Sequence, residues 1–520
     1  MTKTRLALPV LAAMAAIAIA GCGGGGGSSS SSGVAGLAPP DSLVFVEGKL
    51  RPTGSLKSNV DSLAGTIAGV DNLGDLVVEE LEKSAREDGE PFDFEKEVEP
   101  WLGEEAGVAF KSLEGSDSSE PLVIVETTDE AAAQRFVERQ TGQSKVPYED
   151  GSYEGVDFKV GGKEGNALGL LDEFLVVAND EAAFKEAVDA SNGESLAGES
   201  RLTDAMSAAT EGSLADVYAD VGGLIDKSGG QIDPQARELL QDAGIDPSEA
   251  TAVASVVPGT EQVEVDLSSE LGGEKAPGND VSELLGSLPG KAFAAFGVSG
   301  FSDQLEEAID ELDASGISGE VPPHKLKSTL KAMGIDLDKI AASLDGAAAF
   351  AEGNDKANLG GALVLTTSGS GEAAETVANI GKLLRNFGAP GVTAVTGKAS
   401  GFSIRSSELG HYPLVVVARE QRIAIGYGLA QTLRGVEAAG GKTLADQPGY
   451  RAAVSSLGST PISAYVNGPA ALNLAEALVP RKETGFWKAT RYLKHIGYVA
   501  LGTGTSGERA TAKLIAGIEK

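Results

Sequence analysis

The sequence predicts an α+β protein made of two tandem repeats of one module, each with a mainly antiparallel or mixed sheet and helices on one face. Two observations lead to this fold class. Short apolar runs typical of strands occur in pairs more often than they alternate with helices. A series of similar segments also recurs in the same order, at a spacing of roughly 240 to 250 residues.

Internal similarity sets the predicted domain boundaries. Residues 43–47 (LVFVE) have a counterpart in 292–296, the run 122–128 in 362–367, and Tyr218 in Tyr465. Chance similarity would not keep this order and spacing, so we place repeat 1 at residues 37–275 and repeat 2 at residues 284–520. The segment 274–279 (EKAPGN) is the expected linker.

In chain order, the first strong element is an amphipathic helix from about residue 73. Residues 122–125 (LVIV) then form a short apolar run that suits a buried strand. Asp129 stands at an N-cap position, where its carboxylate accepts a free backbone N–H of the next helix. Residues 174–177 predict another strand, and residues 253–257 and 263–267 predict a hairpin. In repeat 2, residues 377–387 predict the counterpart helix and 423–425 a strand. The helical apolar stripes are Leu73, Leu76, Val77 and Leu81; Ala132, Ala133, Phe136 and Val137; and Val377, Ile380, Leu384 and Phe387.

The N-terminus has the layout of a bacterial lipoprotein signal. Lys3 and Arg5 precede an apolar stretch from residue 6 to 20, which is too short to span a bilayer. It ends in Ile19-Ala-Gly-Cys22, where two small residues let a peptidase reach the backbone and the thiol accepts a lipid. We therefore expect a signal peptide at 1–21, acylation of Cys22, and a Gly/Ser tether at 22–36.

This leader predicts an extracytoplasmic protein whose partner is the lipid bilayer, through the acylated N-terminus. Acyl chains gain about 0.8 kcal/mol per buried methylene, so two or three chains would hold the protein firmly. The alternative is a secreted protein with a stray Cys beside an ordinary cleavage site. The chain contains one Cys, and it stands at the position that the lipid signal requires.

The composition argues against several kinds of partner and site. The 520 residues carry a net charge of −34 with a pI near 4.5, which argues against nucleic acid as a partner. A single Cys excludes an internal disulfide and a Cys-ligated zinc site, and three scattered His offer little for a metal. We predict no metal site and no cofactor.

The charge is unevenly divided. Residues 37–275 hold 17 basic and 52 acidic side chains, a net charge of −35, whereas residues 276–520 hold 23 and 24, a net charge of −1. Solubility explains an acidic surface without any partner. The functional interpretation is a polar partner, calcium or a cationic ligand for the first repeat.

Repeat 2 contains the opposite feature, a basic segment at 480–495 that we expect to be a docking surface. Three interpretations stay open. A basic amphipathic helix could lie on anionic headgroups or on a polyanionic wall polymer. It could also bury Trp487 and Tyr492 in the core with its cations in solvent, or dock on the acidic repeat 1. The surface residues are Arg481, Lys482, Trp487, Lys488, Arg491 and Lys494.

No motif for catalysis stands out. Residues 502–507 match G-x-G-x-x-G, but no helix is predicted to follow, as a phosphate cradle requires. His324, His411 and His495 lack the neighbouring Ser or Asp motifs of a hydrolase. Paired acids recur in both repeats, at 93 and 95 and at 336 and 338, but they do not have calcium-loop spacing. We predict no catalytic residue.

The lipid signal, the tether, the opening 37–47 (LAPPDSLVFVE) and the duplicated Ala-rich α+β repeats together resemble a family of bacterial lipoproteins known as domain of unknown function 3352. The resemblance covers nearly the whole chain after the leader. It implies an envelope location and carries no activity, cofactor or site.

From these features we expect a non-enzymatic envelope lipoprotein that binds an envelope protein, a polymer or a small ligand. The alternative is an extracellular hydrolase acting on cell-wall or other polymer. A concave site with convergent acids or His and a displaced pKa would favour the enzyme, and a groove without them would favour binding.

Overall fold

The computed structural model describes residues 33–519, except 89–91, 113–120, 145, 163–164, 228–248, 271–279, 299, 317–321, 370, 387–388, 406–411, 438–441 and 508. The expected signal peptide, Cys22, the linker 274–279, Phe387 and His411 lie outside the described residues. The described chain mixes helices and strands, and its strands pair antiparallel, which confirms the α+β class with antiparallel sheet.

The chain divides into two compact units. Unit 1 extends to Lys275 and includes the late stretch Thr505–Ala512. Unit 2 covers Ala276–Gly504 and Lys513–Glu519. The sequence placed residues 505–512 with the second repeat, whereas the structure groups them with unit 1.

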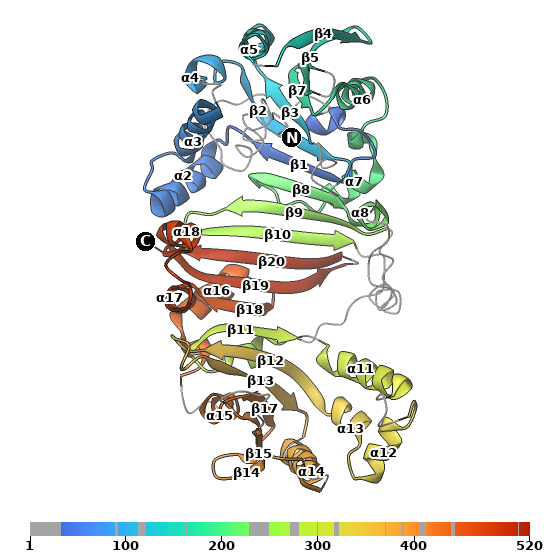
Figure 1. The fold of residues 1–520 in the computed structure, drawn as a ribbon, viewed down its shortest axis with the longest axis vertical. Helices are drawn as coiled ribbons and strands as arrows, with labels where there is room; N and C mark the ends of the chain where they lie inside the picture. Colours follow the sequence, from blue (N-terminus) through green and yellow to red (C-terminus); the bar gives the residue numbers. More distant parts are fainter. Residues whose placement is uncertain are drawn as a thin grey trace. The chain divides into compact units, whose positions relative to one another are not determined.

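The strands of unit 1 lie side by side in an order that differs from their order in the chain, as Figure 1 shows. The order is β4 (Tyr148–Tyr153), β5 (Val156–Gly161), β6 (Ala167–Leu171), β7 (Phe174–Ala178), β3 (Leu122–Thr127), β2 (Leu102–Phe110), β1 (Val44–Lys49), β8 (Ala215–Asp220), β9 (Thr251–Pro258) and β10 (Gln262–Glu270). β9 and β10 are the predicted hairpin.

Both faces of this sheet are covered, which corrects the prediction of helices on one face. Val123 and Val125 of β3 pack into a core with Trp101 and Phe136. Their neighbours Leu122 and Ile124 belong to a second core, on the other face. A continuous apolar run such as β3 buries both faces of its strand, so helices are needed on both sides.

Each core has its own helices. The first contains α3 (Leu73–Asp88), α4 (Phe94–Glu97) and α5 (Glu130–Gln143), and the second η1 (Val34–Leu37), α6 (Glu181–Asn192), η2 (Leu196–Gly198) and α7 (Ser200–Met206). Unit 1 also contains α2 (Gly54–Ala68) and α8 (Val221–Lys227).

Helix starts follow local side-chain chemistry. The carboxylate of Asp129 accepts the N–H of Ala132 at 2.9 Å, which confirms the predicted N-cap of α5. Asp93 and Asp336, each the first of a recurring acid pair, cap α4 and α13 (Leu337–Ala342) in the same way. Helix capping therefore accounts for these two acids.

The folded part begins earlier than the predicted boundary at residue 37. Val34 is 2% exposed and packs in the core that contains Phe45. The tether therefore ends before η1, because an apolar side chain with a buried site no longer belongs to a flexible linker.

Unit 2 has its own strand order (Figure 1). The order is β14 (Val392–Val395), β15 (Ser400–Ile404), β16 (Leu414–Arg419), β17 (Arg422–Tyr427), β13 (Gly360–Thr367), β12 (Leu344–Glu352), β11 (Ala292–Val298), β18 (Ile462–Asn467), β19 (Ile496–Ser506) and β20 (Arg509–Ile518). The end of β19 and the start of β20 fall in the stretch Thr505–Ala512 that is grouped with unit 1, and the rest of both strands belongs to unit 2. Residues 502–506 of the G-x-G-x-x-G match lie in β19, so they form no phosphate cradle.

Unit 2 also has a core on each face of its sheet. One contains α10 (Ser282–Gly286), α15 (Leu429–Val436), η4 (Leu444–Asp446) and α16 (Pro448–Leu457); the other contains α11 (Phe301–Ser315) and α14 (Glu372–Asn386). Val377 of the predicted stripe is 1% exposed in the second core. The remaining helices are α12 (Leu326–Ala332), α13, α17 (Gly468–Leu478) and α18 (Thr484–Leu493).

Candidate functional site

Two shallow cavities lie on either side of residues 39–43 in unit 1. The first, of about 210 Å³, lies against the start of α6, and the second, of about 230 Å³, lies against β8 and α8. Ser42 lines both cavities. The first is lined by Pro39, Ser42, Ala109, Lys111, Leu122, Asn179, Asp180, Ala182, Ala183 and Glu186. The second is lined by Pro40, Asp41, Ser42, Leu43, Leu196, Glu199, Arg201, Tyr218, Asp220 and Lys227.

The segment between the cavities is held rigidly by backbone and side-chain hydrogen bonds. The hydroxyl of Ser42 donates to the carbonyl of Pro39 at 2.7 Å, and Ser42 is 3% exposed. Leu43 donates its N–H to Phe110 and accepts one from Asp220, at 2.8 and 2.7 Å. Residues 39–43 are thus fixed between β2 and β8, and the two cavities have a rigid common wall.

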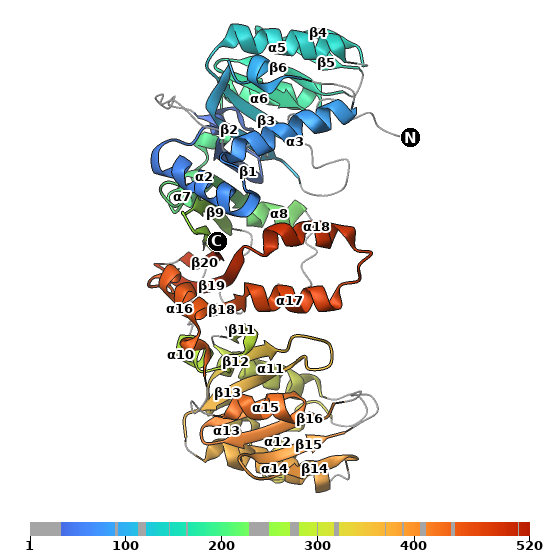
Figure 2. The same cartoon turned by 90° about the vertical axis from the view of Figure 1, so that its left-hand side faces the viewer.

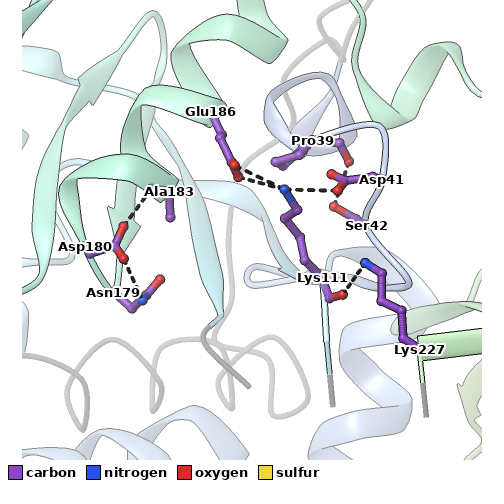
Figure 3. Close-up of polar contacts among 9 residues, drawn as sticks. All are labelled: Pro39, Asp41, Ser42, Lys111, Asn179, Asp180, Ala183, Glu186 and Lys227. Carbon is purple, nitrogen blue, oxygen red and sulfur yellow. Dashed lines mark hydrogen bonds and ion pairs between the residues drawn. The ribbon is translucent and has the colours of Figure 1, made fainter. Parts of the chain in front are cut away.

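Lys111 is the central charge of the first cavity. Its ammonium lies 3.0 Å from Asp41 and 3.1 Å from Glu186, and Lys227 donates to its backbone carbonyl at 2.9 Å (Figure 3). Partial burial lowers the pKa of Lys111, but hydrogen bonds to Asp41 and Glu186 outweigh it and raise the pKa above its ordinary value. Lys111 therefore stays charged and does not serve as a base.

The start of α6, beside Lys111, is satisfied by its own cap. Asp180 accepts the N–H of Ala183 at 2.8 Å, and the amide of Asn179 points toward the same carboxylate (Figure 3). A negative cap already occupies the positive end of the helix. The first cavity therefore offers a fixed cation and fixed carboxylates together, which suits a ligand with charges of both signs.

The second cavity combines an apolar floor with an ion pair. Leu43 and Leu196 are buried, and Arg201 bonds Asp220 at 3.0 Å. Burial, and then the negative charge of Asp220, raise the pKa of Tyr218 to about 12. The phenol therefore remains protonated, and the residues lining this cavity include no His that could activate a hydroxyl.

Glu47, in the middle of β1, is a strongly perturbed acid of unit 1. It lies directly opposite Asp216 of β8, whose carboxylate accepts hydrogen bonds from Ser255 at 2.5 Å and Ser213 at 2.6 Å. Burial, followed by the charges of Asp216 and Glu105, raises the pKa of Glu47 to about 7. Neither Glu47 nor Asp216 lines the two cavities described above.

No group of three or more metal-ligating side chains that could hold an ion occurs in the described ranges. Searched over the same residues, no helix has both the length and the apolar character needed to cross a membrane.

The predicted docking surface lies on α18 and the turn before it. Arg481 and Lys482 are in the turn, Lys488 and Arg491 are on the helix, and Lys494 follows its last turn; all five are exposed. Trp487 is half-buried, with the Arg481 guanidinium 3.9 Å from its ring centre. No side chain of α18 is fully buried. The interpretation that Trp487 and Tyr492 fill the core is therefore wrong, because both rings are only half-buried.

The sequence did not predict a site at Lys111. The opening motif 37–47 contains Asp41 and Ser42 and could have indicated the position of the cavities. Lys111 and Glu186 lie far from the motif in the sequence, after β2 and on α6, so only the fold brings them to it. Cys22 lies outside the described residues, and His324 and His495 belong to unit 2 and line neither cavity.

Comparisons with known proteins identify a family without an activity. No curated protein matches the chain. Among solved structures, two crystal forms of TP0453 are similar, at 12% and 13% identity with a TM-score of 0.27 for each. The match covers 48% of this chain and 83% and 82% of theirs. A family model described as "Protein of unknown function (DUF3352)" matches residues 72–398, more than half of the sequence, and the chain therefore belongs to that family.

Proposed function

We propose that this protein is a non-enzymatic lipoprotein of the cell envelope, held at the membrane by acylated Cys22, and that unit 1 binds a small polar ligand or a partner's charged segment. The observation that carries the binding role is the Lys111 ammonium, fixed between Asp41 and Glu186 at the wall of a cavity. Charges held in place in this way favour recognition, because little side-chain freedom is lost when a ligand binds.

The lining residues indicate the chemistry of the ligand. Carboxylates of Asp41 and Glu199 and the ammonium of Lys227 surround the second cavity, above the apolar Leu43 and Leu196. A zwitterion with a short apolar part fits this combination. A nucleophile paired with a base is absent from the lining of both cavities, which favours binding over catalysis.

A thermal-shift screen of small zwitterions, followed by calorimetry, tests the proposal on the chain from Gly23 to Lys520. A ligand of the second cavity should lose at least tenfold in affinity with Lys227→Ala, since a hydrogen bond to a charged group contributes about 1.5–3 kcal/mol. Lys57→Ala is the control, because Lys57 is a lysine of unit 1 that lines neither cavity. A ligand of the first cavity should instead lose affinity with Lys111→Ala, and a ligand whose affinity neither change alters would contradict the proposal.

One observation favours the alternative, a hydrolase of cell-wall or other extracellular polymer. Glu47, with its raised pKa, stands opposite Asp216, and a protonated acid beside a second carboxylate is the arrangement that glycosidases use. Incubation with wall polymer and assay of released reducing ends tests it. Release that disappears in Glu47→Gln would establish the hydrolase, and no release would leave the binding role.

We also infer that the two units are copies of one module. The strand order of unit 1 becomes that of unit 2 when ten is added to each strand number, from β4 and β14 to β10 and β20. Tyr218 on β8 and Tyr465 on β18 are 2% and 1% exposed, each beside the first strand of its unit. Superposition of experimentally determined units should place Tyr218 on Tyr465; a different strand order in either unit would contradict the duplication.

A further inference from the structure

The exposed face of α18 and the turn before it carry an excess of positive charge. Residues 468–494 contain two acids, Glu476 and Glu483. The same segment contains five cations: Arg481, Lys482, Lys488, Arg491 and Lys494. All five cations are exposed, and none forms an ion pair within the described ranges. Solvated cations that lie this close together favour an anionic surface.

The helix places aromatic rings beside these cations. Lys488 and Arg491 are three residues apart and share one face of α18. Trp487 stands four residues before Arg491, and Tyr492 four residues after Lys488, so one ring lies at each margin of the cationic stripe. The ring of Tyr492 has the Arg491 guanidinium 4.4 Å from its centre.

α17 and α18 form a helical pair in unit 2. Figure 2 shows the two helices side by side, running away from β18. Leu478 at the end of α17 and Leu493 at the end of α18 are 43% and 37% exposed. Exposed leucines and half-buried aromatic rings thus lie close to the cations on this helical pair, where a partner could contact them.

We propose that this α18 surface, defined by Arg481, Lys482, Trp487, Lys488, Arg491 and Lys494, binds the face of an anionic lipid bilayer. The cations meet the phosphate headgroups, and Trp487 and Tyr492 lie at headgroup depth, where aromatic rings with one polar end are stable. A soluble polyanion would use the cations alone. The rings and the exposed leucines favour a partner with an apolar interior beneath its charge.

The inference goes beyond the ligand-binding role of unit 1 and does not depend on it. The proposed acylation of Cys22 already places the chain near a membrane, and a second, reversible contact through α18 would hold unit 2 against that surface. Anchors of this kind gain strength when a lipid is combined with a basic patch.

Vesicle binding by the chain from Gly23 to Lys520 tests the inference, because this chain keeps every described residue and carries neither leader nor lipid. It should bind vesicles of phosphatidylglycerol mixed with phosphatidylcholine and should not bind pure phosphatidylcholine. Lys488→Gln with Arg491→Gln should lower the partition coefficient about 25-fold, since each cation at such a surface contributes about a factor of five.

Unit 2 offers a matched control in α14. Lys382 and Arg385 are exposed cations with the same spacing on another helix, and Lys382→Gln with Arg385→Gln should leave vesicle binding unchanged. Thermal melting of both double variants should match the wild type, because all four side chains are exposed. Equal losses in the two double variants would show a nonspecific charge effect and overturn the proposal.

Tryptophan emission supplies a second readout. The chain has two tryptophans, and Trp101 is fully buried, so a blue shift on adding vesicles reports Trp487. Binding to phosphatidylglycerol with this shift supports the bilayer contact. Binding without the shift, or binding to soluble polyphosphate but not to vesicles, would assign the surface to a polymer and overturn the proposal.

Discussion

Replacing Glu47 with Gln should stabilise unit 1 at alkaline pH. Glu47 lies in the centre of β1, opposite Asp216, and its carboxylate receives no hydrogen bond from the described part of the chain. Burial, then the charges of Asp216 and Glu105, raise its pKa to about 7, against 4.5 ordinarily, although Lys49 acts in the opposite direction. The folded state therefore disfavours the ionised form of this side chain.

The sign of the pH dependence follows from the direction of the shift. As pH rises from about 4.5 to about 7, the unfolded chain releases the Glu47 proton before the folded chain does, so stability falls. Above about pH 7 both states are ionised and the full cost, about 3 kcal/mol, remains. Glutamine is neutral throughout, so Glu47→Gln removes this cost.

The unfolding free energies of Glu47→Gln and the wild type should be measured at pH 5.5 and at pH 8. Both values lie above the pI near 4.5, where the protein carries little net charge and tends to aggregate. Over this range the advantage of Glu47→Gln over the wild type should grow by about 2 kcal/mol, which corresponds to about 4–8 °C in Tm. Urea unfolding followed by fluorescence measures it, because Trp101 is buried in the core of unit 1.

When Glu47→Gln and the wild type are compared at the same pH, the effect of the other acids on the free energy of unfolding is the same in both proteins and cancels. Glu194→Gln is the control, since Glu194 is exposed and should give a difference below about 0.5 kcal/mol at both pH values. An advantage of Glu47→Gln that is equal at pH 5.5 and pH 8, or a loss of stability at pH 8, would refute the reasoning.

Three further predictions concern the anchor, a helix cap and the core. Cys22→Ser should move the protein from the detergent phase to the aqueous phase, or leave it as unprocessed precursor; equal phase partitioning of variant and wild type would contradict the lipid anchor. Asp129→Ala removes the hydrogen bond to Ala132 that begins α5 and should cost about 1 kcal/mol in urea unfolding, whereas no change would show that the cap contributes nothing. Phe136→Ala should cost about 3–5 kcal/mol, because Phe136 is 2% exposed with its ring 5.3 Å from that of Trp101, and it should also change Trp101 emission; a cost below about 1 kcal/mol would contradict the core assignment.

Local chemistry was readable from the sequence. The Asp129 cap, the strand at 122–125 and the hairpin around residues 258–262 depend on neighbours within a few residues. Short-range hydrogen bonds and apolar patterns control such features, so they can be predicted before the fold is known. The same holds for the family, which the opening motif and the repeated elements indicated.

The exposure of α18 is a different case. Its sequence predicted a basic helix with aromatic residues, but the sequence alone allowed Trp487 and Tyr492 to lie in the core. Whether a half-apolar helix is buried depends on the surface available to receive it, and that surface is assembled from distant strands. The structure leaves the helix without a fully buried side chain.

The sequence by itself determined the helix cap at Asp129 and the buried strand at 122–125, because each depends on side chains close together in the chain. Only the tertiary structure placed the Lys111 ammonium between Asp41 and Glu186, covered both faces of the sheet, and set Glu47 opposite Asp216. These contacts join residues up to about 170 positions apart, and their strength comes from burial and fixed geometry, which exist only after the strands have found their order.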